Sequence, residues 1–142
     1  MPEHSQVHLP LPETSSIRLL FIEPGAFAEP LKVRLEVFPD LETCPPFNAL
    51  SYTWGDPKLV ETISCNGTDV SIGKNLADAL RRFRASTPNY QHDAIWADAL
   101  CINQDDLLEK THQVRLMRRI YQKAGRVLIW LGPDTGDFDD AL

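Results

Sequence analysis

The residues that could carry chemistry are concentrated in IWADALCINQDD, residues 95–106, where an apolar run contains one acid and ends in polar side chains. The acid is Asp98, and a carboxylate inside an apolar strand needs hydrogen bonds or a cation to offset its lost hydration. Asp98 could lock a neighbouring loop or helix end, form the wall of a site, or do both. The polar residues that close the run are Asn103, Gln104, Asp105 and Asp106.

Glu109 is the sharpest candidate for a catalytic carboxylate, because it lies on the first turn of the helix predicted to follow this run. Asp106 at the N-cap and Glu109 three residues later also resemble a capping box, although Ser or Thr is the usual first residue of that motif. The spacing alone therefore leaves catalysis and helix capping both open for Glu109.

SYTWGD, residues 51–56, places a second group of candidates at the end of another predicted strand. Tyr52 and Trp54 beside a glycine turn could stack on a flat ring. The commoner role of such residues is to pack in the core.

Phosphate loops, metal sites and Cys–His hydrolases are not supported. GTDVSIGK (67–74) has five residues between its glycines instead of four, and Asn75 stands where Ser or Thr would bind magnesium. The four histidines and three cysteines have no metal-ligand spacing, so we predict no metal site. Cys101 could act as a nucleophile with His92 or His112, but we favour a buried core residue.

Composition narrows the class of protein. A chain of 142 residues that is 43% hydrophobic fits one globular domain. The net charge of −6 argues against a nucleic-acid or anionic-membrane partner. An odd number of cysteines without a Cys-x-x-Cys pair predicts free thiols in a reducing compartment, hence a cytoplasmic protein.

The two ends of the chain differ in the structure that we predict for them. Residues 1–16 have no Lys or Arg and no apolar core, so we expect a disordered N-terminal tail rather than a signal peptide. GPDTGDFDDAL at the other end reads as a loop and the start of a helix. We therefore expect residues 17–142 to be the N-terminal domain of a longer, C-terminally truncated protein.

The N-terminal half is predicted to be rich in strands. Residues 17–25 and 31–40 read as strands that pair in a hairpin, and 47–56 as another strand. Asn66-Gly67 predicts a tight turn within a hairpin over 61–73. Asn75 is expected to cap a helix that ends near 87–89, with Arg81, Arg82 and Arg84 on its solvated face and with the apolar stripe Leu76, Ala79, Leu80 and Phe83.

The C-terminal half is predicted to form a strand–helix–strand unit. Residues 94–102 read as a buried strand, and 126–132 as a second one. Between them, a helix begins at Asp106 and ends near Gly125, with the stripe Val114, Met117, Ile120, Tyr121 and Ala124. The fold class is therefore α/β, with a central parallel sheet flanked by helices and β-hairpin additions in the N-terminal half. Ligands gather at the carboxyl ends of such strands.

Two segments together resemble the heterokaryon-incompatibility (HET) domain of filamentous fungi: ALSYTWGD and WADALCINQDDLLEKTHQVRLMRRIYQKAGRVLIWLGP. The resemblance covers about residues 47–133, and ISCNG and NLADALRRFR fit the segment between. Ala97, where the family usually has Ile, and Lys110, where Arg is common, are mild departures. The matching positions are Ser51, Tyr52, Trp54, Gly55, Trp96, Asp98, Cys101, Ile102, Asn103, Gln104, Glu109, Gln113, Val114, Met117, Ile120, Tyr121, Ala124, Trp130, Leu131 and Gly132.

The resemblance implies a cell-death effector in fungal non-self recognition, with a fold distantly similar to TIR domains. Many TIR domains cleave NAD+ with one Glu at the start of a helix, and Glu109 occupies a comparable place. NAD+ is then a substrate, and no cofactor is required. Catalysis would fall to Glu109 and Asp98, with Asp56 as a competing acid. The ligand contacts would come from Ser51, Tyr52, Trp54, Gly55, Asp56, Asn103 and Gln104.

The resemblance also implies partners. TIR-type enzymes often work only when assembled, so self-association is expected, together with an upstream sensor of non-self or a C-terminal regulatory domain. The alternative is a non-enzymatic module that oligomerises and signals through partners, in which Glu109 is only a helix cap. A pocket at the ends of the 94–102 and 126–132 strands that contains Glu109 and Trp54 would favour the enzyme, and a filled site with a dry apolar surface patch would favour the module.

Overall fold

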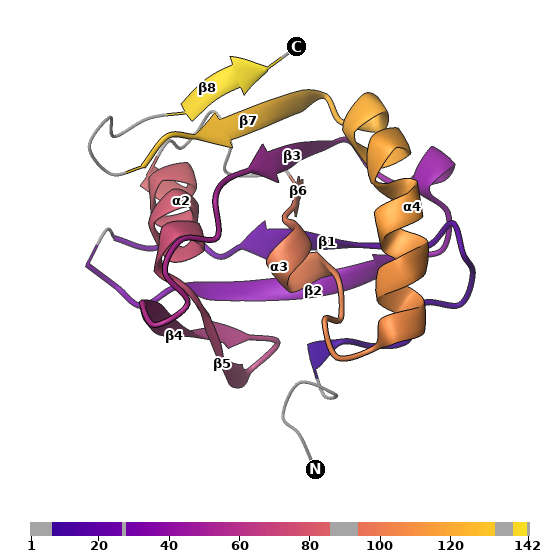
Figure 1. Cartoon of the computed structure of the whole chain (residues 1–142). Coiled ribbons are helices and arrows are strands. Elements are labelled where there is room, and N and C mark those ends of the chain that lie inside the picture. Colours follow the sequence, from indigo (N-terminus) through magenta and orange to yellow (C-terminus); the bar gives the residue numbers. More distant parts are fainter. Residues whose placement is uncertain (1–6, 27, 86–93, 133–137, 142) are drawn as a thin grey trace.

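The computed structural model describes residues 7–26, 28–85, 94–132 and 138–141, and these form one mixed sheet with helices packed on it (Figure 1). The strands run in the order β5-β4-β2-β1-β6-β3-β7-β8. Their bounds are β1 Ile17–Ile22, β2 Lys32–Phe38, β3 Phe47–Ser51, β4 Val60–Cys65, β5 Thr68–Gly73, β6 Ala94–Trp96, β7 Arg126–Trp130 and β8 Phe138–Ala141. The helices are η1 Leu41–Thr43, α2 Lys74–Ala85, α3 Asp98–Cys101 and α4 Leu107–Lys123.

The expected α/β class is confirmed, but the sheet is mixed rather than parallel. β3 runs parallel to both β6 and β7, and β2 runs parallel to β4. The pairs β1–β2, β1–β6, β4–β5 and β7–β8 are antiparallel. The pairing of the first two strands and the parallel arrangement of the 94–96 and 126–130 strands are as predicted. β8 is a strand where the sequence suggested the start of a helix, because it completes an edge beside β7.

The predicted hairpin between β4 and β5 is confirmed with the expected turn. Asn66 and Gly67 both adopt positive φ, 53° and 78°, as a two-residue turn between antiparallel strands requires. The Asn66 side chain also accepts a hydrogen bond from Leu35 N and donates one to the carbonyl of Val7. The turn therefore fixes the hairpin against β2 and the N-terminal segment.

The prediction of one strand over 94–102 is wrong, because β6 is only three residues long and α3 follows it. The Ala97 carbonyl accepts hydrogen bonds from Leu100 N and Cys101 N, closing a helical turn. The Gln104 amide then donates to the Asp98 carbonyl at 2.9 Å. A short apolar run can be a strand or a buried helix, and periodicity does not separate the two. Asp98 consequently begins a helix instead of interrupting a strand.

The helix α2 buries the predicted apolar stripe, Leu76, Ala79, Leu80 and Phe83, but its polar residues differ from expectation. Asn75 lies inside the helix, not at its N-cap, and its amide donates to the Thr53 carbonyl and hydroxyl. Arg84, expected in solvent, is buried and donates to carbonyls of Ala26, Glu29 and Pro30. The predicted helix end at 87–89 lies outside the described residues.

The helix α4 begins as predicted, with the Asp106 carboxylate accepting from Glu109 N at 3.1 Å. In Figure 1 it crosses in front of the sheet. Its inner face contains the buried Ile120, as expected, but Val114 is 53% exposed. Gln113 is buried in its place, because its amide donates to the Ser16 carbonyl.

Residues 7–16, expected as part of a disordered tail, pack on the sheet and helices. Val7 is buried in the core, and the His8 ring lies 2.8 Å from the Leu100 carbonyl. The Ser16 hydroxyl donates to the Pro39 carbonyl. Residues 1–6 lie outside the described residues. Within the described part of the chain, no helix is long and apolar enough to cross a membrane.

Candidate functional site

Glu109 is held in a buried ion pair with Arg18 of β1. The guanidinium donates to both carboxylate oxygens at 2.7 Å, and Asn103 N donates to Oε2 at 2.6 Å. The two side chains are 1% and 9% exposed. Such bidentate, charge-assisted contacts are among the strongest hydrogen bonds in proteins. Both oxygens of the leading catalytic candidate are therefore already engaged within the protein.

Arg18 extends this contact into a network that joins four parts of the fold. Its Nε and Nη2 donate to the Leu9 carbonyl at 3.2 and 2.7 Å, and its Nη1 donates to the Cys101 carbonyl at 3.1 Å. The N-terminal segment, β1, the end of α3 and the start of α4 thus meet at one cation. This network locks the loop before α4 in place.

The capping box expected at α4 is formed only in half. Asp106 caps Glu109 N, but the Glu109 carboxylate reaches Asn103 N, three residues before Asp106, instead of Asp106 N. Asp106 N donates to the Asn103 carbonyl. Glu109 therefore closes the loop 103–106 as well as the helix, which is a larger structural role than a cap.

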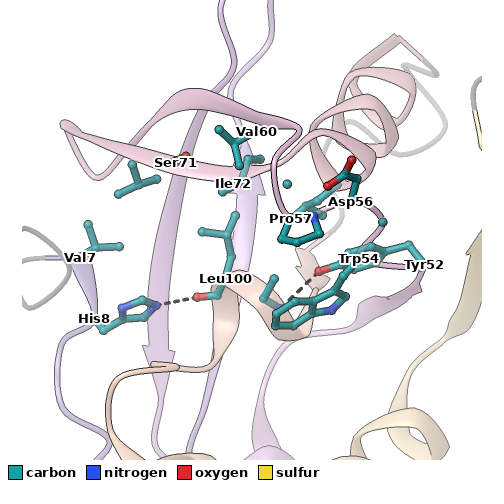
Figure 2. A pocket seen from close by; sticks show the side chains of 15 residues that line it. Val7, His8, Tyr52, Trp54, Asp56, Pro57, Val60, Ser71, Ile72 and Leu100 are labelled. Carbon is teal, nitrogen blue, oxygen red and sulfur yellow. Dashed lines mark hydrogen bonds between the residues drawn. The ribbon is translucent and has the colours of Figure 1, made fainter.

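A cavity of about 410 Å³, here called the Trp54 cavity, lies between the β3–β4 loop, the β4–β5 hairpin, α3 and the N-terminal segment. Figure 2 shows Val7 and His8 on one side of it and Tyr52 and Trp54 on the other. Trp54 is 53% exposed, so its ring is available to a ligand. The lining residues are Val7, His8, Tyr52, Trp54, Gly55, Asp56, Pro57, Val60, Val70, Ser71, Ile72, Gly73, Leu76, Ala99 and Leu100.

Polar groups at the rim of the Trp54 cavity are few and fixed. The Tyr52 hydroxyl donates to Asp98 Oδ1 at 3.1 Å and accepts from Ala99 N at 3.4 Å. Burial, reinforced by the Asp98 charge, raises the pKa of Tyr52, so it stays protonated. Asp56 is exposed, and its Oδ1 accepts from Lys58 N at 2.9 Å. A mostly apolar cavity with a few fixed polar groups is typical of small-molecule sites.

A second cavity, of about 330 Å³, lies at the carboxyl ends of β3 and β7 and is here called the β3–β7 cavity. A third, of about 320 Å³, lies beside Glu109 and is walled by residues 10–14. The β3–β7 cavity is lined by Ser51, Tyr52, Thr53, Asn75, Ile129, Trp130, Leu131 and Gly132.

The structure thus divides the predicted site residues among these places. Tyr52, Trp54, Gly55 and Asp56 share the Trp54 cavity, and Ser51 lines the β3–β7 cavity with Tyr52. Glu109 lines the third cavity, and no described cavity contains both Glu109 and Trp54. The remaining predicted residues, Asp98, Asn103 and Gln104, line none of the three and instead hold α3 and the following loop by hydrogen bonds.

Sequence reasoning missed Arg18 and His8. The signal for Arg18 was available, since it is a charge inside the apolar strand IRLLFI and so needed a buried partner. His8 gave none, because it lies in a segment without periodicity. Within the described ranges, no three His, Cys, Asp or Glu side chains are grouped to hold a metal ion.

Comparisons with known proteins agree with the motifs in these elements. A family model described as "Heterokaryon incompatibility protein (HET)" matches residues 47–141. The chain is 36% identical over 136 residues to Heterokaryon incompatibility protein 6, OR allele, of Neurospora crassa, which covers 87% of the chain. The chain spans about a fifth of that relative's length, 20%. No solved structure matches it significantly. Because the family model covers most of the chain, from β3 to β8, this chain belongs to the heterokaryon-incompatibility (HET) family.

Proposed function

We propose that this domain acts in fungal heterokaryon incompatibility, as the part of a larger protein that triggers cell death. Membership of the HET family and similarity to a Neurospora incompatibility protein support this role. We further propose that it acts in the cytoplasm, that it self-associates, and that an upstream sensor of non-self or a C-terminal regulatory domain controls it. Its partners on this proposal are neither nucleic acid nor membrane, consistent with a net charge of −6.

The proposed activity is hydrolysis of NAD+ to nicotinamide and ADP-ribose, as in TIR-like enzymes. The observation that carries it is the Trp54 cavity, in which an exposed indole and the Asp56 carboxylate lie at one rim of an apolar hollow. The nicotinamide ring would stack on Trp54. As the bond to the ribose breaks, positive charge develops on the ribose carbon, and a nearby carboxylate stabilises it until water adds.

The geometry changes which acid we assign to this step. Glu109 lines a different cavity, and both its oxygens are held by Arg18 and Asn103 N. The Asp56 carboxylate accepts one described hydrogen bond, from Lys58 N, and the residue is exposed to an incoming ligand. We therefore assign the charge-stabilising role to Asp56. Glu109 becomes a positioning residue, and so does Asp98, whose carboxylate holds the Tyr52 hydroxyl in the wall.

NAD+ consumption by concentrated protein tests this assignment, with nicotinamide release followed in wild type, Asp56→Asn and Trp54→Ala. We expect Asp56→Asn to lower kcat by about 10²-fold or more, and Trp54→Ala mainly to raise KM. Leu59→Ala is the matched control, because Leu59 is as exposed as Trp54 yet lines none of the three cavities. Full turnover by Asp56→Asn would overturn the assignment.

A non-enzymatic, oligomerising module is the second candidate, and a specific observation favours it. Leu107, Leu108 and Val114 are large apolar side chains exposed on α4, 78%, 68% and 53%. Exposed apolar groups gathered on one helix are typical of a protein contact surface. If wild-type protein that has been forced to cluster consumes no NAD+, this second function replaces the first.

A further inference from the structure

We propose that the β3–β7 cavity is a second subsite, which binds the adenosine end of the dinucleotide whose nicotinamide end enters the Trp54 cavity. This inference rests on the proposed function, because it names how the same substrate is held. It concerns the cavity lined by Ser51, Thr53, Asn75 and Leu131, to which neither the family match nor the relative assigns a role.

The topology marks this cavity as a place for ligands. From β3 the chain runs through β4, β5 and α2 to β6, which pairs with β3 on one side, and from β6 it returns past β3 to β7 on the other side. Both neighbours run parallel to β3. In open α/β sheets, ligands bind outside the carboxyl ends of the strands at the point where successive connections reverse direction. That point here is the β3–β7 pair, and the cavity lies at its carboxyl end.

The lining is suited to a neutral ring that carries hydroxyl groups. The hydroxyls of Ser51 and Thr53 can donate and accept hydrogen bonds. Asn75 offers its amide oxygen as an acceptor, because its amide nitrogen already donates to the carbonyl and hydroxyl of Thr53. Ile129 and Leu131 supply an apolar wall. Leu131 is 56% exposed, so this wall is open to a ligand. None of the described lining residues is charged. An adenosine fits this chemistry, whereas a phosphate group would find no cation among these described lining residues.

The two cavities are close enough to serve one molecule. Tyr52 lines both of them. A Cβ built on Gly55, which lines the Trp54 cavity, would lie 3.8 Å from Nδ2 of Asn75, which lines the other. At about 410 and 330 Å³ both are at the low end of the roughly 300–1,000 Å³ found for ligand pockets. Each therefore suits one half of a dinucleotide.

Nuclear magnetic resonance of the full chain tests the assignment with adenosine and nicotinamide as separate probes. Adenosine should shift the backbone amides of Thr53 and Gly132, and nicotinamide should shift the indole N–H of Trp54. NAD+ should shift all three. If adenosine shifts Trp54 alone, or shifts none of them while NAD+ binds, the inference is overturned.

Two variants at the cavity complete the test. Asn75→Leu removes the amide oxygen offered to the ligand, together with the two hydrogen bonds that hold Thr53, and should weaken adenosine binding about tenfold, the loss of roughly one good hydrogen bond. Leu131→Ala should weaken it severalfold, and Leu59→Ala, equally exposed at 56% but outside both cavities, should not. Leu131→Ala keeps the test valid if Asn75→Leu fails to fold. Unchanged adenosine affinity in a folded Leu131→Ala would count against the subsite.

These outcomes separate the inference from the proposed function. Adenosine binding at Thr53 and Gly132 without any NAD+ turnover would support the subsite and reject hydrolysis. Turnover of NAD+ with a wild-type KM in folded Leu131→Ala and Asn75→Leu would support hydrolysis and reject the subsite.

Discussion

Replacing Glu109 by Gln separates the structural and catalytic roles of this carboxylate. In the wild type, the Arg18 guanidinium is 1% exposed and donates to both Glu109 oxygens at 2.7 Å. The substitution keeps the shape of the side chain but removes its charge and one of its two acceptors. Arg18 is then left as a buried cation without its counter-charge, which is the costly half of breaking a buried ion pair.

The expected magnitude follows from that geometry. Removing one partner of a buried pair costs about 3–5 kcal/mol, and Gln retains one acceptor oxygen, so we expect about 3 kcal/mol. In a domain of this size each kcal/mol lowers Tm by about 3–4 °C. Glu109→Gln should therefore melt roughly 10 °C below the wild type in a calorimetric or circular-dichroism scan.

The matched control is Glu42→Gln, which breaks another bidentate pair, with Arg119, on the exposed surface. Solvent and salt screen such pairs, so its Tm should stay at the wild-type value. The reasoning is refuted if Glu109→Gln melts with the wild type. If that variant also loses NAD+ turnover at an unchanged Tm, Glu109 is catalytic and the assignment of Asp56 falls.

Two further predictions concern the pH dependence that the buried cysteines cause and the effect of replacing glycines on stability. Burial raises the pKa of Cys65 to about 11 and that of Cys101 to about 12. The folded chain therefore keeps these two thiols protonated at pH values above 9.0, the ordinary thiol pKa, where the unfolded chain releases both protons. The urea midpoint of unfolding, measured in reductant, should stay constant up to about pH 9 and fall between about pH 9 and pH 11. The fall should be smaller in Cys65→Ala. An equal fall in that variant would exclude Cys65 as a cause. Gly67→Ala should lower the free energy of unfolding by about 1 kcal/mol, since φ is +78° and a Cβ there would contact nothing within 4 Å. Gly125→Ala should be near neutral, because its φ lies outside the left-handed region and its Cβ would make an ordinary 3.6 Å contact; equal urea midpoints for the two variants would contradict this.

The sequence patterns predicted correctly those elements that are determined by residues close together in the chain. The Asn66-Gly67 hairpin follows from two residues that tolerate positive φ. The α2 stripe follows from its spacing, and the start of α4 follows from the Asp106 cap. Helix against strand at 94–102 could not be decided this way, because nothing in that run shows that Gln104 will hold the Asp98 carbonyl. On α4, Gln113 is buried instead of the expected Val114, because its amide donates to the distant Ser16 carbonyl.

The candidate site was predictable only where it is contiguous in the chain. Tyr52, Trp54, Gly55 and Asp56 meet in one cavity because they are neighbours on a single loop after β3. Glu109 meets Arg18 across 91 residues of sequence, a contact that forms only when β1 and the start of α4 are brought together. Its position on the first turn of α4 therefore suggested a catalytic role. The long-range contact with Arg18 shows instead that this carboxylate stabilises the fold.

The position of β1 has a consequence for how this family is divided into units. The family match begins at Phe47, after β1 and β2, yet these strands alone connect the β4–β5 hairpin to the rest of the sheet. A chain cut at Phe47 would separate into a two-stranded ribbon and a four-stranded remnant, and Glu109 would lose Arg18. The segment that the family model matches is thus smaller than the unit that folds cooperatively. Chimeras of incompatibility proteins joined before Ile17 should resist proteolysis far better than those joined at Phe47.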